Sequence, residues 1–440
     1  MSNDKSLDFV NNARQSFASV SDNMTEAFHK KKAERIAAIK SYQDLQEIKS
    51  NPPSTGIPFT KFFSDTFPLP LAEAYKQWTV RGDLKQAEED VLSFLPFYPE
   101  PDATRMARSL QVPVGDGNWI NEFEISPTAA EATNDLVLLH GYGAGLAFFY
   151  QNLDSLSSVP GWRLHALDLL GYGRSSRPKF KVNATDPYEK IRETENFFID
   201  SLEQWRIAKG LDRFTFVAHS MGAYFASAYA MKYPGHIKKL VLVSPAGVPR
   251  SPFSIAAQKV AKEKRAVDAA GNPTVPKTSV EIPGWFNYLW EQNVSPFFLV
   301  RGTGPLGPRV VSGWTSRRFA NLPRDQADAL HRYVYTIFNA PGSGEYALNY
   351  LLAPGAHARW PLADRAKDIP CDTIWMYGQN DWMDTTGGLE AIQEIRAHNQ
   401  NVETPSLHVI ENAGHHIFLD NPHDFNELVI SVMKQVEDMP

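Results

Sequence analysis

Short apolar runs recur along the chain, and most are followed by a polar or glycine-containing turn and then by a segment of helical character, such as Pro187–Lys209. Apolar runs of about four to eight residues suit strands that are buried on both faces. Their alternation with helices favours a mostly parallel sheet. Core strands are predicted at Leu136–His140, Leu164–Asp168, Phe214–Ala218, Leu240–Ser244, Thr373–Tyr377 and Leu407–Glu411.

Two helices and a hairpin are expected before this alternating region. The helices are predicted at Ala72–Trp78 and Leu84–Leu95, and the hairpin pairs Arg105–Val114 with Gly117–Ile125. The sequence therefore predicts an α/β fold with helices on both faces of a mostly parallel central sheet.

The alternation stops between Pro249 and about Pro370. A segment of this length between two strands of one sheet must fold over the strand ends, so a large helical cap is predicted. We expect an N-terminal helical and linker segment at 1–70, core at 71–248, the cap at 249–368 and further core at 369–440. A cluster of large apolar cap residues either lines an acyl tunnel or packs the cap on the core: Trp285, Phe286, Tyr288, Leu289, Trp290, Phe297 and Phe298.

Ser220 is the predicted nucleophile. It lies between a predicted strand and a helix of small residues, in the pentapeptide Ala218-His219-Ser220-Met221-Gly222. This is the nucleophile-elbow pattern G-x-S-x-G with Ala in place of the first Gly. Small neighbours let strand and helix approach, and the strained turn projects the serine oxygen. The alternative is a serine that caps the following helix.

Two later strands lead to an acid and a base. Thr373–Tyr377 is followed by Asp381, with Asp384 as the alternative acid. The last predicted strand leads to His415, and the adjacent His416 competes for the same role. A serine, a carboxylate and a histidine that each follow a strand can meet at one edge of a parallel sheet. The three residues therefore predict a catalytic triad in the chain order Ser, Asp, His.

An oxyanion hole is expected beside this triad. The strand that ends at His140 is followed by Gly141-Tyr142-Gly143, where the backbone N–H of Tyr142 can point at a developing oxyanion. The N–H of Met221, directly after the nucleophile, is its natural companion.

Longer strings extend these motifs: Asp168-x-x-Gly171-x-Gly173-x-Ser175, Gly304-Pro305-Leu306-Gly307-Pro308, Trp314-Thr315-Ser316-Arg317-Arg318-Phe319, Gly342-Ser343-Gly344-Glu345-Tyr346 and Tyr377-Gly378-Gln379-Asn380-Asp381-Trp382-Met383-Asp384. On these strings the chain resembles a family of lipid-acting α/β hydrolases. Its fungal members include a mitochondrial cardiolipin-specific deacylase and a soluble lysophosphatidic acid acyltransferase.

The resemblance implies the α/β-hydrolase fold and a serine hydrolase that cleaves fatty-acyl esters of phospholipids at a membrane surface, as in cardiolipin deacylation. Acyl transfer from acyl-CoA to lysophosphatidic acid is the alternative. His415 and Asp420 match a His-x4-Asp motif that the family associates with such transfer, but the match gives no independent evidence for it, because His415 is already needed as the base and Asp420 could equally begin the C-terminal helix. Some animal relatives replace the serine with asparagine and act as lipase co-activators. A non-catalytic lipid-surface adaptor is therefore the alternative of another class.

Charge, motif content and cysteine count argue against several kinds of partner, cofactor and crosslink. The net charge of −6 gives no electrostatic reason to expect nucleic acid as a partner. The sequence has no G-x4-G-K phosphate loop and no metal-ligand His/Cys cluster, so we expect no cofactor and no metal. Cys371 is the only cysteine, which excludes an intrachain disulfide.

Residues 1–50 mix apolar side chains such as Phe9, Phe17 and Phe28 with the basic run Lys30–Lys32. A helix of this composition can lie on a membrane, and a solvated helix or a disordered tail is the alternative because acidic residues interrupt the pattern. The sequence contains no apolar run of about 18 residues or more, so no membrane-spanning helix is predicted. The family resemblance points to a peripheral protein of the mitochondrion, with the cytoplasm or the lipid-droplet surface as alternatives.

Overall fold

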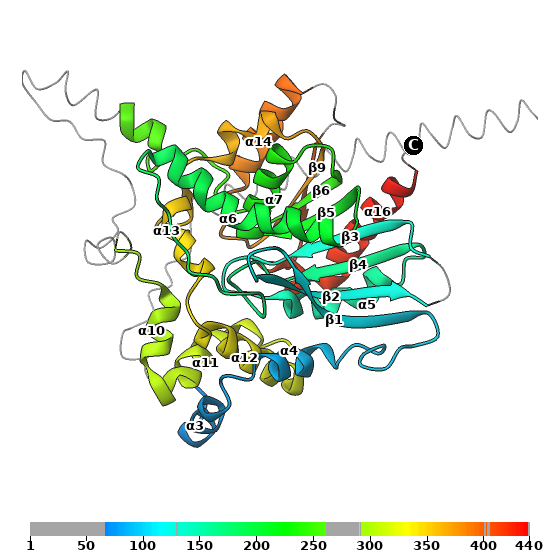
Figure 1. Cartoon of the computed structure of the whole chain (residues 1–440), viewed down its shortest axis with the longest axis vertical. Coiled ribbons are helices and arrows are strands. Elements are labelled where there is room, and N and C mark those ends of the chain that lie inside the picture. The colour runs from blue at the N-terminus through cyan, green and yellow to red at the C-terminus, as the bar shows by residue number, and fades with distance from the viewer. Residues whose placement is uncertain are drawn as a thin grey trace, which may run out of the picture. The chain divides into compact units, whose positions relative to one another are not determined.

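The computed structural model describes residues 67–128, 131–260, 290, 292–399, 402 and 405–438. All of them belong to one unit, Ile57–Pro440. Within this part of the chain, eight strands form one sheet in the order β1-β2-β4-β3-β5-β6-β9-β10 (Figure 1). Their bounds are β1 Arg105–Pro113, β2 Trp119–Pro127, β3 Asn134–Leu139, β4 Trp162–Leu167, β5 Phe214–His219, β6 Ile237–Val243, β9 Asp372–Gly378 and β10 Ser406–Ile410.

The sheet is mostly parallel, as predicted. β3 pairs parallel with β4 and β5, β6 pairs parallel with β5 and β9, and β10 continues the parallel order at the far edge. β2 is antiparallel to both β1 and β4, so the predicted hairpin forms one end of the sheet. β5 is buried along its whole length, which accounts for its continuous apolar run.

Helices cover both faces of the sheet (Figure 1). The bounds on one face are α6 Pro187–Ala208, α7 Met221–Lys232 and α14 Thr385–His398, and on the other α5 Tyr150–Ser157, α15 Ile417–Asp420 and α16 Pro422–Glu437. Successive residues of a strand point to opposite faces, so Phe216 of β5 joins one hydrophobic core and Val217 joins the other. This arrangement confirms the predicted fold class.

Between β6 and β9 the described chain leaves the sheet and becomes helical. The helices are α10 Pro296–Gly302, α11 Gly307–Arg318, α12 Arg324–Asn339 and α13 Leu348–Leu351, followed by the short pair β7 Leu352–Ala353 and β8 His357–Ala358. The two predicted N-terminal helices, α3 (Leu71–Thr79) and α4 (Leu84–Leu92), pack on α11 and α12 respectively (Figure 1). The boundaries predicted for the cap stay a prediction.

Short 3-10 helices complete the description: η1 Leu146–Phe149, η3 Gly304–Leu306, η4 Gly344–Ala347, η5 Leu362–Asp364 and η6 Ala366–Asp368. The predicted N-terminal amphipathic helix and the cap residues Trp285, Phe286, Tyr288 and Leu289 lie outside the described residues. Among the helices that are described, none combines the length and the apolar character that a bilayer span requires.

Candidate active site

The residues singled out by the sequence gather where the parallel strands end. Ser220 follows β5, Asp381 follows β9 and His415 follows β10, while Tyr142 lies just beyond β3. The crevice outside the carboxyl ends of the strands is the usual ligand site of an open parallel sheet. The topology therefore brings together residues as far apart in sequence as Ser220 and His415, which are separated by 195 positions.

Ser220, His415 and Asp381 form a continuous hydrogen-bonded chain. Ser220 Oγ lies 2.9 Å from His415 Nε2, and His415 Nδ1 lies 3.1 Å from Asp381 Oδ1. With a proton on Nδ1 the imidazole donates to the carboxylate, which leaves Nε2 free to accept the serine proton. The geometry is that of a nucleophile, a base and an orienting acid.

Asp381 is buried, with 3% of its surface exposed. Burial alone would raise the pKa of this carboxyl, but the hydrogen bond and charge of His415, together with the Met383 N–H that donates to Oδ1 at 3.0 Å, lower its pKa below the ordinary value. Asp381 is therefore ionised at neutral pH and can stabilise a positive charge on the imidazole.

The alternative acid, Asp384, lies at the start of α14 instead. Its carboxylate accepts hydrogen bonds from the backbone N–H and the hydroxyl of Thr386 and caps the helix. Within the described residues, the carboxylate that reaches the ring of His415 is that of Asp381.

Ser220 has a backbone conformation that residues with side chains seldom adopt, with φ 54° and ψ −119°. Two glycines make the turn possible. A Cβ on Gly222 would collide with the carbonyl oxygen of His140, and a Cβ on Gly141 would come within 2.8 Å of Ser220 Cβ. Ser220 occupies the N-cap position of α7, but its side chain makes no cap hydrogen bond to the helix and lies against His415 instead. Strain of this kind costs about 1–3 kcal/mol and concentrates at functional positions.

Two further histidines surround His415. The ring of His219 lies 4.7 Å from that of His415, and its Nε2 is 2.9 Å from the His415 carbonyl oxygen. Burial, and then the charges of neighbouring groups, hold the pKa values of His219 and His416 well below the usual range. Both rings are therefore neutral at pH 7. In the described part of the chain no hydrogen bond joins His416 to Ser220 or Asp381, so the geometry favours His415 as the base.

Of the two predicted oxyanion donors, Met221 directly follows Ser220, and Tyr142 directly follows Gly141, which lies close to Ser220. Met221 is the first residue of α7, where N–H groups have no acceptor within the helix and the helix dipole favours negative charge. Tyr142 follows Gly141, and its ring stacks on Phe297 of α10 with the ring centroids 5.0 Å apart. A residue of the predicted cap therefore packs on the loop that carries the Tyr142 N–H. The assignment of these N–H groups to an oxyanion stays a prediction.

Asp420, the acid of the His-x4-Asp motif, contacts the backbone beside His415. Its Oδ2 accepts a hydrogen bond from the N–H of Gly414 at 2.9 Å, and its Oδ1 lies 2.7 Å from Arg318 Nη1 in α11. Arg318 also donates to the carbonyl oxygen of His416 at 3.3 Å. The motif acid thus holds the loop of His415 and connects it to α11.

Residues 135–422 match the model of the α/β-hydrolase-fold family. The chain belongs to the α/β-hydrolase family. This α/β hydrolase is 38% identical over 308 residues to a 1-acylglycerol-3-phosphate O-acyltransferase of Arabidopsis thaliana, an alignment that covers 69% of this chain and 67% of the relative. It is 32% identical over 340 residues to a (lyso)-N-acylphosphatidylethanolamine lipase of Bos taurus, which covers 76% and 87% of the two chains.

Among solved structures, this α/β hydrolase is similar to naproxen esterase of Bacillus subtilis, with a TM-score of 0.50 and 14% identity over 80% of this chain and 96% of the esterase. At that identity the similarity shows the fold alone. The family match and the two relatives confirm the resemblance to lipid-acting α/β hydrolases that the sequence motifs indicated.

Three side chains around Ser220, His415 and Asp381 of this α/β hydrolase were not predicted as part of the site. Trp382 is 61% exposed, and its ring lies 5.0 Å from that of His415. The other two are His219 and Arg318, which contact the backbone of the His415 loop. All three lie within or beside the sequence motifs, but linear spacing does not reveal which side chains of a loop face the histidine.

Two groups of side chains in the described α/β hydrolase could hold a metal ion. The first consists of Glu122, Glu124 and His165, all buried. The ammonium of Lys209 lies 3.2 Å from Glu122 and 2.6 Å from Glu124, and Arg108 lies 2.6 Å from Glu124, so side-chain cations already pair with both carboxylates. The second group, on α16, comprises His423, Asp424 and Glu427. Neither group includes Ser220, Asp381 or His415.

Proposed function

We propose that this α/β hydrolase is a serine acyl hydrolase that cleaves fatty-acyl esters of phospholipids. The observation that carries the proposal is the hydrogen-bonded chain from Ser220 through His415 to Asp381, with distances of 2.9 and 3.1 Å. A serine that contacts a base, which a buried carboxylate orients in turn, is the arrangement of an activated nucleophile.

In the proposed reaction His415 Nε2 removes the hydroxyl proton of Ser220 while Oγ attacks the ester carbonyl carbon. The N–H groups of Tyr142 and Met221 stabilise the oxyanion, each by about 3–4 kcal/mol. Collapse breaks the bond to the glycerol oxygen, which takes the proton from His415 and leaves as the lysolipid. Water then attacks the acyl-enzyme with His415 as base, and the fatty acid is released.

Two observations support a lipid as the substrate. The relatives are named as an acyltransferase of acylglycerol phosphate and as a lipase of N-acylphosphatidylethanolamine. In addition, large apolar side chains are exposed near the site and on α10, among them Trp382 beside His415 and Phe298, each more than half exposed. Exposed apolar groups of this kind suit contact with a lipid surface. Among phospholipids we put cardiolipin first, and the mitochondrion as the compartment, as in the deacylase that the motifs resemble.

Acyl transfer from acyl-CoA to lysophosphatidic acid is the second candidate, and the name of the plant relative favours it. The same acyl-enzyme would form, and the hydroxyl of the lysolipid would replace water as the attacking group. Asp420 adds no independent support for transfer, because its carboxylate bonds to Gly414 and Arg318 in the free protein.

Mass spectrometry of lipid products tests the proposal. The full chain and its Ser220→Ala variant are incubated with vesicles of cardiolipin, phosphatidylcholine and lysophosphatidic acid, with acyl-CoA present. We expect free fatty acid and monolysolipid from the wild type alone, and the consumed headgroup identifies the substrate. Phosphatidic acid formed without net hydrolysis would favour transfer. Equal lipid binding by both proteins with no turnover would favour the adaptor.

A further inference from the structure

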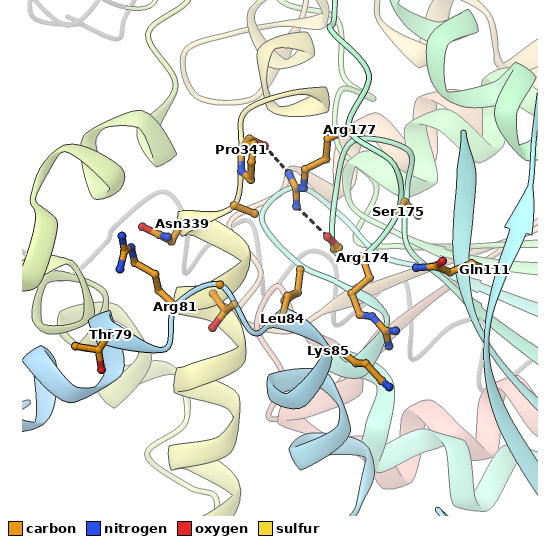
Figure 2. Close-up of a pocket in the computed structure, with 14 residues that line it drawn as sticks. Thr79, Arg81, Leu84, Lys85, Gln111, Arg174, Ser175, Arg177, Asn339 and Pro341 are labelled. Carbon is orange, nitrogen blue, oxygen red and sulfur yellow. Dashed lines mark hydrogen bonds between the residues drawn. The ribbon is translucent and has the colours of Figure 1, made fainter. Parts of the chain in front are cut away.

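A cavity of about 820 Å³ opens where loop 171–177 meets the described helices of the cap region. Its walls come from the turn between α3 and α4, the start of α4, strand β1, the loop after β4 and the C-terminal end of α12 (Figure 2). Four of the described residues that line it are cationic and none is acidic: the cationic ones are Arg81, Lys85, Arg174 and Arg177. We refer to it as the cationic cavity.

Arg177 brings a positive charge that no carboxylate in the described part of the chain neutralises by direct contact. Its guanidinium donates only to backbone carbonyl oxygens, those of Gly171 and Pro341 at 2.9 Å and that of Gly173 at 3.0 Å. Figure 2 shows the bond to Pro341. These bonds use three of its five N–H donors. Carbonyl groups orient the guanidinium without cancelling its charge.

The carboxylates whose charges act on Arg177 are those of Asp168 and Glu345. Asp168 accepts hydrogen bonds from the backbone N–H groups of Leu146 and Arg174. Glu345 forms an ion pair with Arg301 at 2.6 Å. In the described residues neither carboxylate hydrogen-bonds to the guanidinium of Arg177, so its two remaining N–H donors are available to a ligand.

Arg81 and Lys85 add charge on the other side of the opening. Arg81 donates to the carbonyl oxygen of Trp78 at 2.7 Å and lies over its indole ring, and no described carboxylate pairs with it. Lys85 lies 3.7 Å from Glu89, a long and exposed contact of small energetic value. Neither cation is needed to hold the fold in the way that Arg177 is.

Within the described residues Arg174, unlike the other three cations, has a carboxylate partner at close distance. It lies 2.7 Å from Glu88, which is fully buried. Burial, and then the nearby charge of Asp168, raise the pKa of Glu88 well above its usual range. The charge of Asp168 also acts on Arg174, so this arginine adds little excess charge, and the free positive charge of the cavity comes mainly from Arg81, Lys85 and Arg177.

The loop that carries these arginines also contacts the candidate active site. Tyr172, between Gly171 and Gly173, lies with its ring 6.0 Å from that of Tyr142 and 5.8 Å from that of His140. One loop thus presents arginines to the cationic cavity and an aromatic ring to the residues beside Ser220.

We propose that the cationic cavity binds a phosphate group, carried by the headgroup of a glycerophospholipid or by coenzyme A. Several guanidinium and ammonium donors around one opening suit a phosphate, because its oxygens accept charge-assisted hydrogen bonds from more than one side. The volume is in the range of pockets that hold small molecules, which is about 300–1,000 Å³. This binding site goes beyond the proposed reaction and does not depend on turnover at Ser220.

Calorimetric titration of the full chain with sn-glycerol 3-phosphate and, separately, with coenzyme A tests the inference. We expect at least one probe to bind, and its affinity to fall about tenfold or more in the double variant Arg81→Gln, Lys85→Gln. Gln111→Glu, which adds a carboxylate to an exposed position of the same cavity, is expected to weaken binding as well. The probe that responds identifies the source of the phosphate.

The matched control is the double variant Lys76→Gln, Arg324→Gln, which removes two charges from side chains that are 80% and 96% exposed and lie outside the cavity. Its affinity should equal that of the wild type, as should that of Ser220→Ala. Unchanged melting temperatures would exclude unfolding as the cause of a loss. Absence of binding by both probes, or equal affinities in cavity and control variants, would overturn the inference whatever the outcome at Ser220.

Discussion

Arg318 in α11 and Asp420 after the His415 loop form an ion pair with Nη1 and Oδ1 2.7 Å apart, although 102 residues separate them in sequence. Asp420 also accepts the N–H of Gly414, directly before His415. Both side chains are largely buried, at 16% and 23% exposed. The pair therefore fixes the backbone that carries the imidazole and ties it to a helix of the predicted cap.

Replacing Arg318 by Gln should disturb the position of His415 without removing a reacting group. We expect kcat for ester hydrolysis to fall about tenfold, the equivalent of about 1.4 kcal/mol, with KM nearly unchanged. Arg318→Lys keeps the charge and should recover part of the loss. The exposed Arg324→Gln is the control, and an equal loss of kcat in that variant would contradict a positioning role for Arg318.

Asp381 and Asp384 can be separated by the same substitution at each position. Asp381→Asn should lower kcat by about 10⁴, because the imidazole loses the ionised carboxylate that orients it. Asp384→Asn keeps a capping residue at α14 and should leave kcat close to the wild type. Steady-state kinetics of both variants decides between them, and the reverse pattern would exchange the two roles.

Phe297 and the adjacent Phe298 allow a matched test of packing between α10 and the loop of Tyr142. Phe297 is buried and stacks on Tyr142 and Phe338, with ring centroids 5.0 and 4.5 Å apart, whereas Phe298 is 57% exposed. Phe297→Ala should lower the free energy of unfolding by about 3–5 kcal/mol. Phe298→Ala should change it by less than about 0.5 kcal/mol. Chemical denaturation measures both, and equal losses would refute the difference in packing.

Glu88 gives a prediction for the dependence of stability on pH. Its pKa is raised in the folded protein, chiefly by burial, so above the unfolded value of about 4.3 the folded state keeps a proton that the unfolded chain releases. Stability from this group is therefore complete at lower pH and declines as pH rises toward the raised pKa.

Glu88→Gln mimics the protonated carboxyl and should remove that decline. The melting temperature of the variant should change less than that of the wild type between about pH 5 and about pH 8. In this range the folded wild type holds a proton on Glu88 that the unfolded chain has released. Thermal unfolding at several pH values measures the two slopes. Identical slopes would mean that Glu88 is ionised in the folded protein.

Much of the fold could be predicted from sequence because its signals are local. The apolar run at Phe214–Ala218 becomes a fully buried strand and its counterparts become further parallel strands, of which the edge strand β10 is only half-buried; the small residues around Ser220 permit one particular turn. Asp381 could be ranked above Asp384 only on spacing, since both follow the same strand. The structure separates them because Asp384 is engaged by Thr386.

Other features depend on contacts between distant segments, which no local pattern encodes. Nothing in the spacing of Arg318 and Asp420 indicates that they pair, or that α4 packs on α12. The cationic cavity joins Arg81, Arg177 and the end of α12, so it exists only once these elements have packed together.

The most direct test of the central claim, that Ser220 is an activated nucleophile, is covalent labelling by a fluorophosphonate followed by peptide mass spectrometry. We expect a single adduct on the peptide that contains Ser220, with labelling lost in Ser220→Ala and strongly slowed in Asp381→Asn. Absence of labelling in the folded wild type, or labelling that persists in Ser220→Ala, would contradict the claim.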